Sequence, residues 1–136
     1  MRIATWNVNS VRTRAERIAA FLEREDVDVL AMQETKTADS QFPYATFEAA
    51  GYEVAHVGVS QWNGVAIASR VGLDNVRDSF TRQPAFAKKG DPEREARAVG
   101  AVCGGVDVWS LYVPNGRDIG DPHYDYKLQF LWSLAD

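Results

Sequence analysis

The chain has 136 residues, 46% hydrophobic and 25% charged, which is the composition of one ordinary globular domain with room for a core. Its net charge of −4 argues against broad nonspecific adhesion to nucleic acid or acidic membranes, although 15 lysines and arginines can still form a local basic face. The single cysteine, the early polar residues and the lack of a long apolar run argue against a disulfide framework, a signal peptide and a membrane span, so we expect a cytoplasmic protein.

The first part of the chain predicts a strand, an amphipathic helix and a second strand. These are residues 2–8, 11–25 and 27–32. Ser10 suits the N-cap of the helix. A strand–helix–strand unit of this size places its two strands parallel, so the strand ends that carry Asn7 and Glu34 should lie at the same edge of a sheet. Sites in α/β proteins form at that edge.

The middle of the chain predicts one short helix and a series of strands. The helix is expected at 42–51, and the strands are expected at 52–59, 64–70, 75–80, 96–104 and 106–113. The last two strands form a hairpin across Gly104 and Gly105, and a polar loop at 81–95 precedes them. Cys103 lies in an apolar run and is expected to be a buried thiol.

An amphipathic helix is expected at 123–136, with Asp121 as its cap next to Pro122. Its apolar stripe is predicted from four residues at helical spacing. They are Tyr124, Leu128, Leu131 and Ala135.

Asn7 and Glu34 are candidate metal ligands, because a carboxylate and an amide offer the hard oxygen atoms that Mg²⁺ and Mn²⁺ bind. The alternative is structural: Asn7 would satisfy a buried turn, and Glu34 would cap its segment. Tyr112 ends an apolar strand, where its phenol could donate a hydrogen bond to a phosphate or serve only as a half-buried core residue. Trp62 could stack on a base or fold back onto the core.

Six short motifs occur in an order that resembles the exodeoxyribonuclease III family. They are TWNVNSVR, VLAMQETK, NGVAIAS, EARA, YVPNG and YKLQFL. WNVNS with QETK is typical of the wider endonuclease/exonuclease/phosphatase superfamily, and YVPNG followed by KLQFL indicates its abasic-site DNA repair branch. The resemblance runs from Met1 to Leu134.

This resemblance implies half of a four-layer α/β sandwich, with a mixed β-sheet and flanking helices, and a phosphodiesterase that depends on Mg²⁺ or on Mn²⁺ in its place. It implies that Asn7 and Glu34 hold the metal and that Tyr112 is the catalytic tyrosine at the scissile phosphate. The implied partner is double-stranded DNA, nicked at abasic sites or trimmed from 3′ ends. Further DNA-contacting or supporting positions are implied at Asn9, Arg12, Lys36, Arg97 and Asn115.

The family pattern continues with a Gly-Asp-x-Asn motif and a Ser-Asp-His motif, and the chain contains neither. We therefore expect residues 1–136 to be the N-terminal portion of a single domain, which supplies roughly one of the family's two sheets. Alone it should be inactive, because hydrolysis needs the nucleophile and the charge-stabilising groups together. An uncovered half-sheet predicts self-association. The alternatives are a superfamily phosphodiesterase or phosphatase with a non-DNA substrate, and a non-catalytic half-domain.

Overall fold

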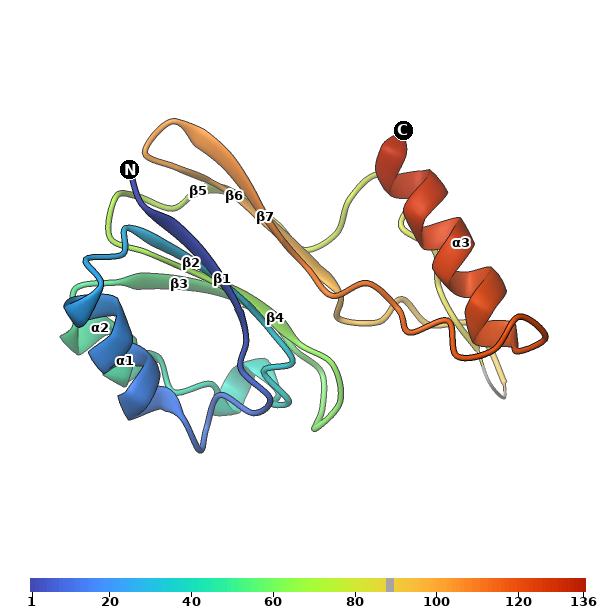
Figure 1. The fold of residues 1–136 in the computed structure, drawn as a ribbon, viewed down its shortest axis with the longest axis horizontal. Coiled ribbons are helices and arrows are strands. Elements are labelled where there is room, and N and C mark those ends of the chain that lie inside the picture. The colour runs from blue at the N-terminus through green and yellow to red at the C-terminus, as the bar shows by residue number, and fades with distance from the viewer. Residues whose placement is uncertain (88–89) are drawn as a thin grey trace. The chain divides into compact units, whose positions relative to one another are not determined.

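The computed structural model describes residues 1–87 and 90–136, which form two compact units (Figure 1). The first unit consists of Met1–Asp78 with Ala96–Tyr112, and the second of Ser79–Glu95 with Val113–Asp136. Two residues of the polar loop expected at 81–95, Lys88 and Lys89, lie outside the described residues.

A four-stranded mixed sheet is the larger sheet of the first unit, in the order β1-β2-β4-β3. Its strands are β1 (Ile3–Asn7), β2 (Val29–Gln33), β3 (Glu53–Val57) and β4 (Val65–Ser69). β1 and β2 are parallel, with Asn7 opposite Gln33, whereas β4 is antiparallel to both β2 and β3. The predicted parallel unit is confirmed, and the ends of β1 and β2 therefore share one sheet edge.

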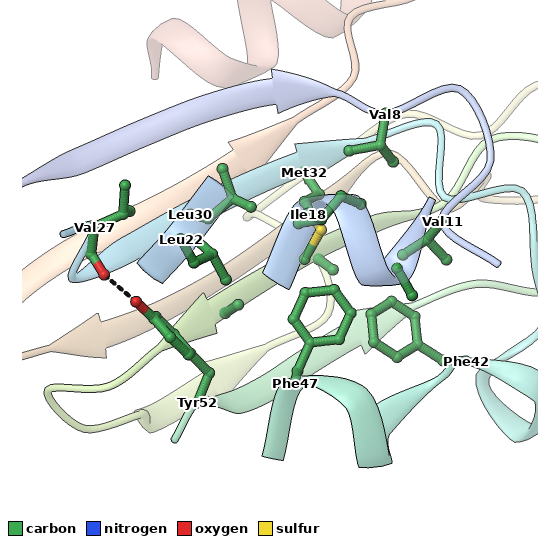
Figure 2. Packing of buried hydrophobic residues seen from close by; sticks show 13 residues of the cluster. Val8, Val11, Ile18, Leu22, Val27, Leu30, Met32, Phe42, Phe47 and Tyr52 are labelled. Atoms are coloured by element: carbon green, nitrogen blue, oxygen red, sulfur yellow. Dashed lines mark hydrogen bonds between the residues drawn. The ribbon is translucent and has the colours of Figure 1, made fainter. Parts of the chain in front are cut away.

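Two helices pack on one face of this sheet. They are α1 (Ala15–Arg24) and α2 (Tyr44–Ala49), with the short 3-10 helix η1 (Asp39–Gln41) before α2. Ile18 and Leu22 of α1 are fully buried in one cluster with Leu30 and Met32 of β2 and with Phe47 of α2 (Figure 2). Burial of each such side chain contributes about 1.5–3 kcal/mol, so this cluster is a major part of the core.

Ser10 is not the N-cap of α1, contrary to the sequence-based expectation. The helix begins at Ala15, its N-cap position is Arg14, and Ser10 has a left-handed φ of +87°. The amide of Ser10 donates to the carbonyl of Glu34 at 2.8 Å, and the amide of Val11 donates to the carbonyl of Thr35 at 3.0 Å. These contacts hold the segment after β1 against the end of β2, which delays the start of the helix.

A second, three-stranded antiparallel sheet has the order β5-β6-β7. Its strands are β5 (Asp74–Arg77), β6 (Ala98–Cys103) and β7 (Val106–Leu111). The predicted hairpin between β6 and β7 is confirmed, with Gly104 and Gly105 at φ of +56° and +82°. Such positive φ values suit a type I′ turn, which matches the twist of the strands. Cys103 is buried, as predicted.

The two sheets share an apolar core. Val29, Val65 and Ile67 of the larger sheet are fully buried in one cluster with Val99 and Ala101 of the smaller sheet. The expectation that the chain supplies roughly one sheet is therefore wrong, because it contributes strands to two packed sheets. The central strands β2 and β4 of the larger sheet are buried on both faces, by the helices on one side and by the smaller sheet on the other.

A groove of about 380 Å³ lies between β1 and β2 on one side and β7 on the other. It is lined by Ile3, Ala4, Thr5, Ala31, Gln33, Val108, Trp109 and Leu111. β1 and β7 are edge strands of their sheets. No helix among the described residues is long and apolar enough to cross a membrane.

The second unit contains α3 (Pro122–Ala135). Asp121 is its N-cap, as predicted, and accepts a 2.8 Å hydrogen bond from the amide of His123. The predicted apolar stripe is wrong: the buried residues of α3 are Tyr126 and Phe130, whereas 38% of Leu131 is exposed. The buried face is set by two phenylalanines of the 79–95 segment. Phe86 stacks on Tyr126 at 4.7 Å, and Phe80 meets Phe130 at 5.1 Å.

Candidate metal and phosphate site

Asn7 and Glu34 meet at the shared edge of β1 and β2. Asn7 is the last residue of β1, and Glu34 directly follows β2. Nδ2 of Asn7 donates a hydrogen bond of 2.9 Å to Oε1 of Glu34. The amide oxygen of Asn7 accepts from the amide of Asn9 at 3.2 Å. The structure therefore brings both predicted metal ligands together in a defined orientation.

Glu34 lies in a turn that the surrounding backbone holds in an unusual conformation. Glu34 and Lys36 both have a φ of +54°, which is the left-handed region. Thr35 between them is fully buried. Its amide donates to the carbonyl of Gly64 at 3.2 Å, and the amide of Lys36 donates to the carbonyl of Asn63 at 2.9 Å. Left-handed non-glycine residues persist only where neighbouring structure over-determines them, as it does in this turn.

The Glu34 carboxylate is ionised at neutral pH. Hydrogen bonds hold its pKa below the usual value: Asn7 makes the largest contribution and Tyr112 and Lys36 add to it, while burial acts in the opposite direction. Nζ of Lys36 lies 3.4 Å from Oε2 of Glu34. The tyrosine hydroxyl thus joins the same cluster as the two candidate metal ligands.

Lys36 also connects Glu34 to the segment after β1. Its Nζ donates to Oδ1 of Asn9 at 2.6 Å, and Asn9 has a left-handed φ of +45°. About a third of the Lys36 side chain remains exposed, at 32%. The ammonium is therefore available to a phosphate that approaches this edge of the sheet.

The Arg97 side chain packs against the ring of Tyr112 and bonds to its backbone. Its guanidinium lies 4.9 Å from the centre of the Tyr112 ring, and its Nη1 donates to the carbonyl of Tyr112 at 3.1 Å. The amide of Tyr112 donates back to the carbonyl of Arg97 at 2.8 Å. Arg97 is only 8% exposed. Of the roles predicted for it, this placement favours support of Tyr112.

Arg12 makes its side-chain contact outside the cluster, and Asn115 belongs to the second unit. Nη1 of Arg12 donates to Oε1 of Gln41 at 3.3 Å, in the segment before α2. Asn115 belongs to the second unit, where its Oδ1 accepts from the amide of Arg117 at 2.8 Å. That bond makes Asn115 a local turn residue within its own unit.

The donor atoms fit a hard divalent cation. Mg²⁺ binds oxygen, keeps several waters and uses one or two carboxylates, which matches Glu34. Asn7 turns its amide nitrogen toward that carboxylate and its oxygen toward the amide of Asn9, so its side chain would rotate to offer the oxygen to the same ion. Within residues 1–87 and 90–136, no group of three or more His, Cys, Asp or Glu side chains could hold a metal ion. A cation held by Glu34 and Asn7 would therefore complete its coordination with water and phosphate oxygens.

Sequence reasoning overlooked the residues that support the Glu34 turn. His56 has no nucleophile motif beside it in the sequence, so its local pattern indicates no catalytic role. The structure places Nε2 of His56 2.8 Å from Oγ1 of Thr35 and Nδ1 2.7 Å from Oδ1 of Asp39. These three residues are separated along the chain, and no local spacing pattern indicates the contact.

Trp62 lies in the loop between β3 and β4 and is 66% exposed. Val59 in the same loop is 75% exposed. The neighbouring residue Asn63 accepts the backbone bond from Lys36. Of the two interpretations of Trp62, the exposed position favours a surface role over packing in the core.

A model of the Endonuclease/Exonuclease/phosphatase family matches residues 4–136. Exodeoxyribonuclease III of Haemophilus influenzae is 34% identical over 89 residues, which are 65% of this chain and 33% of the relative. The structure of an AP endonuclease from Archaeoglobus fulgidus covers 98% of this chain, with 41% identity and a TM-score of 0.83. A 3′ phosphatase from Neisseria bound to a product DNA hairpin covers 98% of this chain, with 31% identity and a TM-score of 0.89.

The α/β fold of mixed sheet and flanking helices matches these solved structures. The chain spans only part of each relative: 33% of the Haemophilus protein and 49% of both the Archaeoglobus and the Neisseria chains.

Proposed function

Because the chain belongs to the endonuclease/exonuclease/phosphatase family, we propose that it is the N-terminal portion of a Mg²⁺-dependent DNA phosphodiesterase. The substrate would be double-stranded DNA, nicked at abasic sites or trimmed from 3′ ends. The observation that carries this proposal is the cluster of Glu34, Asn7, Tyr112 and Lys36 at one sheet edge. The names of the relatives support DNA as the substrate class.

Each side chain in the cluster has a separate task. Glu34 and Asn7 would hold the cation, which when bound supplies Lewis-acid stabilisation of the phosphate charge. The Tyr112 hydroxyl would donate to a phosphate oxygen, and Arg97 beneath the ring keeps that hydroxyl in place. Lys36 would attract the DNA backbone as a point charge.

The chain alone supplies only part of this chemistry. Residues 1–136 would form one portion of a single domain whose remaining groups orient the attacking water. Without them we expect no measurable turnover, because positioning and charge stabilisation act together. The competing proposals are a superfamily member with a non-DNA substrate and a non-catalytic half-domain that binds metal or DNA. The cytoplasmic location also stays a prediction.

The test combines metal binding with turnover. Mn²⁺ binding to the 136-residue chain is measured by electron paramagnetic resonance. Glu34→Gln is the test variant, and Glu48→Gln, at an exposed position of α2, is the matched control. We expect binding by the wild type and Glu48→Gln, and at least roughly tenfold weaker binding by Glu34→Gln. A folded wild type that binds no Mn²⁺ would refute the metal site.

The same proteins are then incubated with an abasic-site duplex and Mg²⁺, with EDTA as a control. Nicking that depends on both Mg²⁺ and Glu34 would overturn the expectation of an inactive half. Hydrolysis of a small chromogenic phosphodiester, without any activity on or affinity for DNA, would favour the non-DNA alternative.

We also propose that the isolated chain self-associates as a second copy covers the groove between β1 and β7. Both strands are sheet edges with unpaired backbone groups, and most of the groove lining is apolar. Sedimentation velocity should show a concentration-dependent dimer that Leu111→Lys abolishes. A monomer at all concentrations would contradict this proposal.

A further inference from the structure

His56 is a buried histidine that the proposed chemistry does not use. It lies in β3, opposite Ala66 of β4, and its side chain has no exposed surface. The imidazole packs against the Phe42 ring at a centroid distance of 4.5 Å. A polar ring in such a place is costly unless its nitrogens have partners, so its contacts indicate what it does.

The two ring nitrogens of His56 face two different segments. Nε2 lies 2.8 Å from Oγ1 of Thr35, in the turn between Glu34 and Lys36. Nδ1 lies 2.7 Å from Oδ1 of Asp39, although without the alignment of a good hydrogen bond. The same Asp39 oxygen accepts from the amide of Gly58 at 2.9 Å. His56 therefore links the Glu34 turn to the start of η1.

The protonation of the ring follows from these partners. Burial lowers the pKa of His56, and the Asp39 carboxylate only partly opposes that effect. At neutral pH the imidazole is uncharged, with its proton on Nδ1 toward the carboxylate. Nε2 is then an acceptor, so the Thr35 hydroxyl donates to it. This arrangement of protons satisfies the contact between Nε2 and Thr35 and directs the Nδ1 proton toward the Asp39 carboxylate.

The backbone packs closely against the His56 and Thr35 side chains. A Cβ at Gly58 would lie 2.3 Å from Cε1 of His56, and a Cβ at Gly64 would lie 2.0 Å from Oγ1 of Thr35. Both glycines therefore allow the backbone to close on the two side chains. Thr35 is held by its amide, its hydroxyl and this steric enclosure.

We propose that His56 is a positioning residue, which through Thr35 holds Glu34 and Lys36 in the left-handed conformation that aims their side chains at the metal and phosphate. The link from this turn to catalysis rests on the proposed function, whereas the positioning itself does not. Relaxation of the turn would separate Glu34 from Asn7 and Tyr112, and would leave the core of the sheet intact.

The test measures the turn and the metal separately. His56→Phe keeps an aromatic ring against Phe42 but removes both polar contacts, and Thr35→Val removes only the hydroxyl. His123→Phe is the matched control. It removes a histidine of the second unit whose Nδ1 lies 2.7 Å from Oδ1 of Asp121. His56→Gln restores a polar partner for Thr35.

Amide hydrogen exchange by NMR gives the first readout. In His56→Phe and Thr35→Val, exchange at the amides of Thr35 and Lys36 should accelerate at least roughly tenfold relative to the interior amides of β2. His123→Phe should leave these rates unchanged, and His56→Gln should recover part of the protection. Unchanged exchange in either test variant would overturn the positioning role, and the Thr35→Val result decides the matter if His56→Phe does not fold.

Mn²⁺ affinity gives the second readout. It should fall roughly tenfold or more in both test variants, as is usual when a group that orients a ligand is removed. If the wild type itself binds no Mn²⁺, the proposed function fails, while the exchange data still decide whether His56 positions the turn. Accelerated exchange with unchanged metal affinity would refute the link from the turn to the metal.

Discussion

Gly64 occupies a position where one added methyl group would collide with the turn that carries Glu34. Its φ is +93°, and a Cβ there would lie 2.0 Å from Oγ1 of Thr35 and 3.3 Å from the amide nitrogen of Lys36. An alanine in the left-handed region costs about 1–2 kcal/mol. Overpacking against the buried Thr35 adds about 1–3 kcal/mol. Gly64→Ala should therefore lower the free energy of unfolding by roughly 2–5 kcal/mol.

Gly51→Ala is the matched control for this prediction. Gly51 has nearly the same φ, +91°, but an added Cβ would have no heavy atom within 4 Å. Urea unfolding of Gly51→Ala should report the backbone cost alone, about 1–2 kcal/mol. Thr35→Ala should cost less in the Gly64→Ala background than in the wild type, because it also removes the hydroxyl that the methyl group meets.

If Gly64→Ala destabilised the protein no more than Gly51→Ala, the close packing of Gly64 on Thr35 would be refuted. A cost of Thr35→Ala that is the same in the wild type and in Gly64→Ala would also contradict this steric contact. Thermal unfolding offers an independent check, since a loss of this size lowers Tm by roughly 7–17 °C in a chain of this length.

Three further predictions follow from burial, titration and exposure. Leu22→Ala should lower the free energy of unfolding, measured in urea, by about 2–5 kcal/mol, because Leu22 is fully buried. Leu131→Ala, at a partly exposed site, should lower it far less, and equal losses would contradict the assignment of Leu22 to the core. Burial lowers the pKa of His56 in the folded state, so the unfolded state binds a proton at higher pH than the folded state does. The contribution of the neutral His56 to the free energy of unfolding should therefore be complete above the ordinary histidine pKa of about 6.5 and should decrease as the pH falls below it. Urea titrations from pH 8 to pH 5 should show this slope in the wild type, and a persistent equal slope in His56→Phe would assign it to another group. Trp62→Ala should weaken binding of a DNA duplex roughly 5–100-fold in fluorescence anisotropy, whereas the equally exposed Trp132→Ala should not; identical affinities for both variants would exclude stacking by Trp62.

The positions of the strands, and the directions of the β1–β2 pair and of the β6–β7 hairpin, could be predicted because hydrophobic runs and local spacing indicate them. The apolar run at 27–32 and the helical spacing before it sufficed to predict that β1 and β2 are parallel. That pairing in turn placed Asn7 near Glu34, which the hydrogen bond between them bears out. Their role as metal ligands remains a prediction.

Features that depend on distant partners could not be predicted in the same way. The buried face of α3 is chosen by Phe80 and Phe86, and a helical wheel of α3 alone ranks Tyr126 no higher than Tyr124. The start of α1 was misplaced at Ser10 because backbone bonds to the end of β2 occupy that segment. In both cases a tertiary contact overrode a local preference.

The same distinction explains why Glu34 was found from the sequence and His56 was not. A carboxylate at the end of a parallel strand is visible as a polar residue after an apolar run, and its chemistry follows from its type. His56 has meaning only through Thr35 and Asp39, and these reach it because β3 pairs with β4 beside the Glu34 turn. Substitutions at Thr35, His56 or Asp39 should therefore alter the geometry of the site, although the glutamate after the apolar run stays in the sequence. A chain of this family that keeps the glutamate but lacks the hydroxyl, the imidazole or the close-packed glycine would need another means of holding the turn.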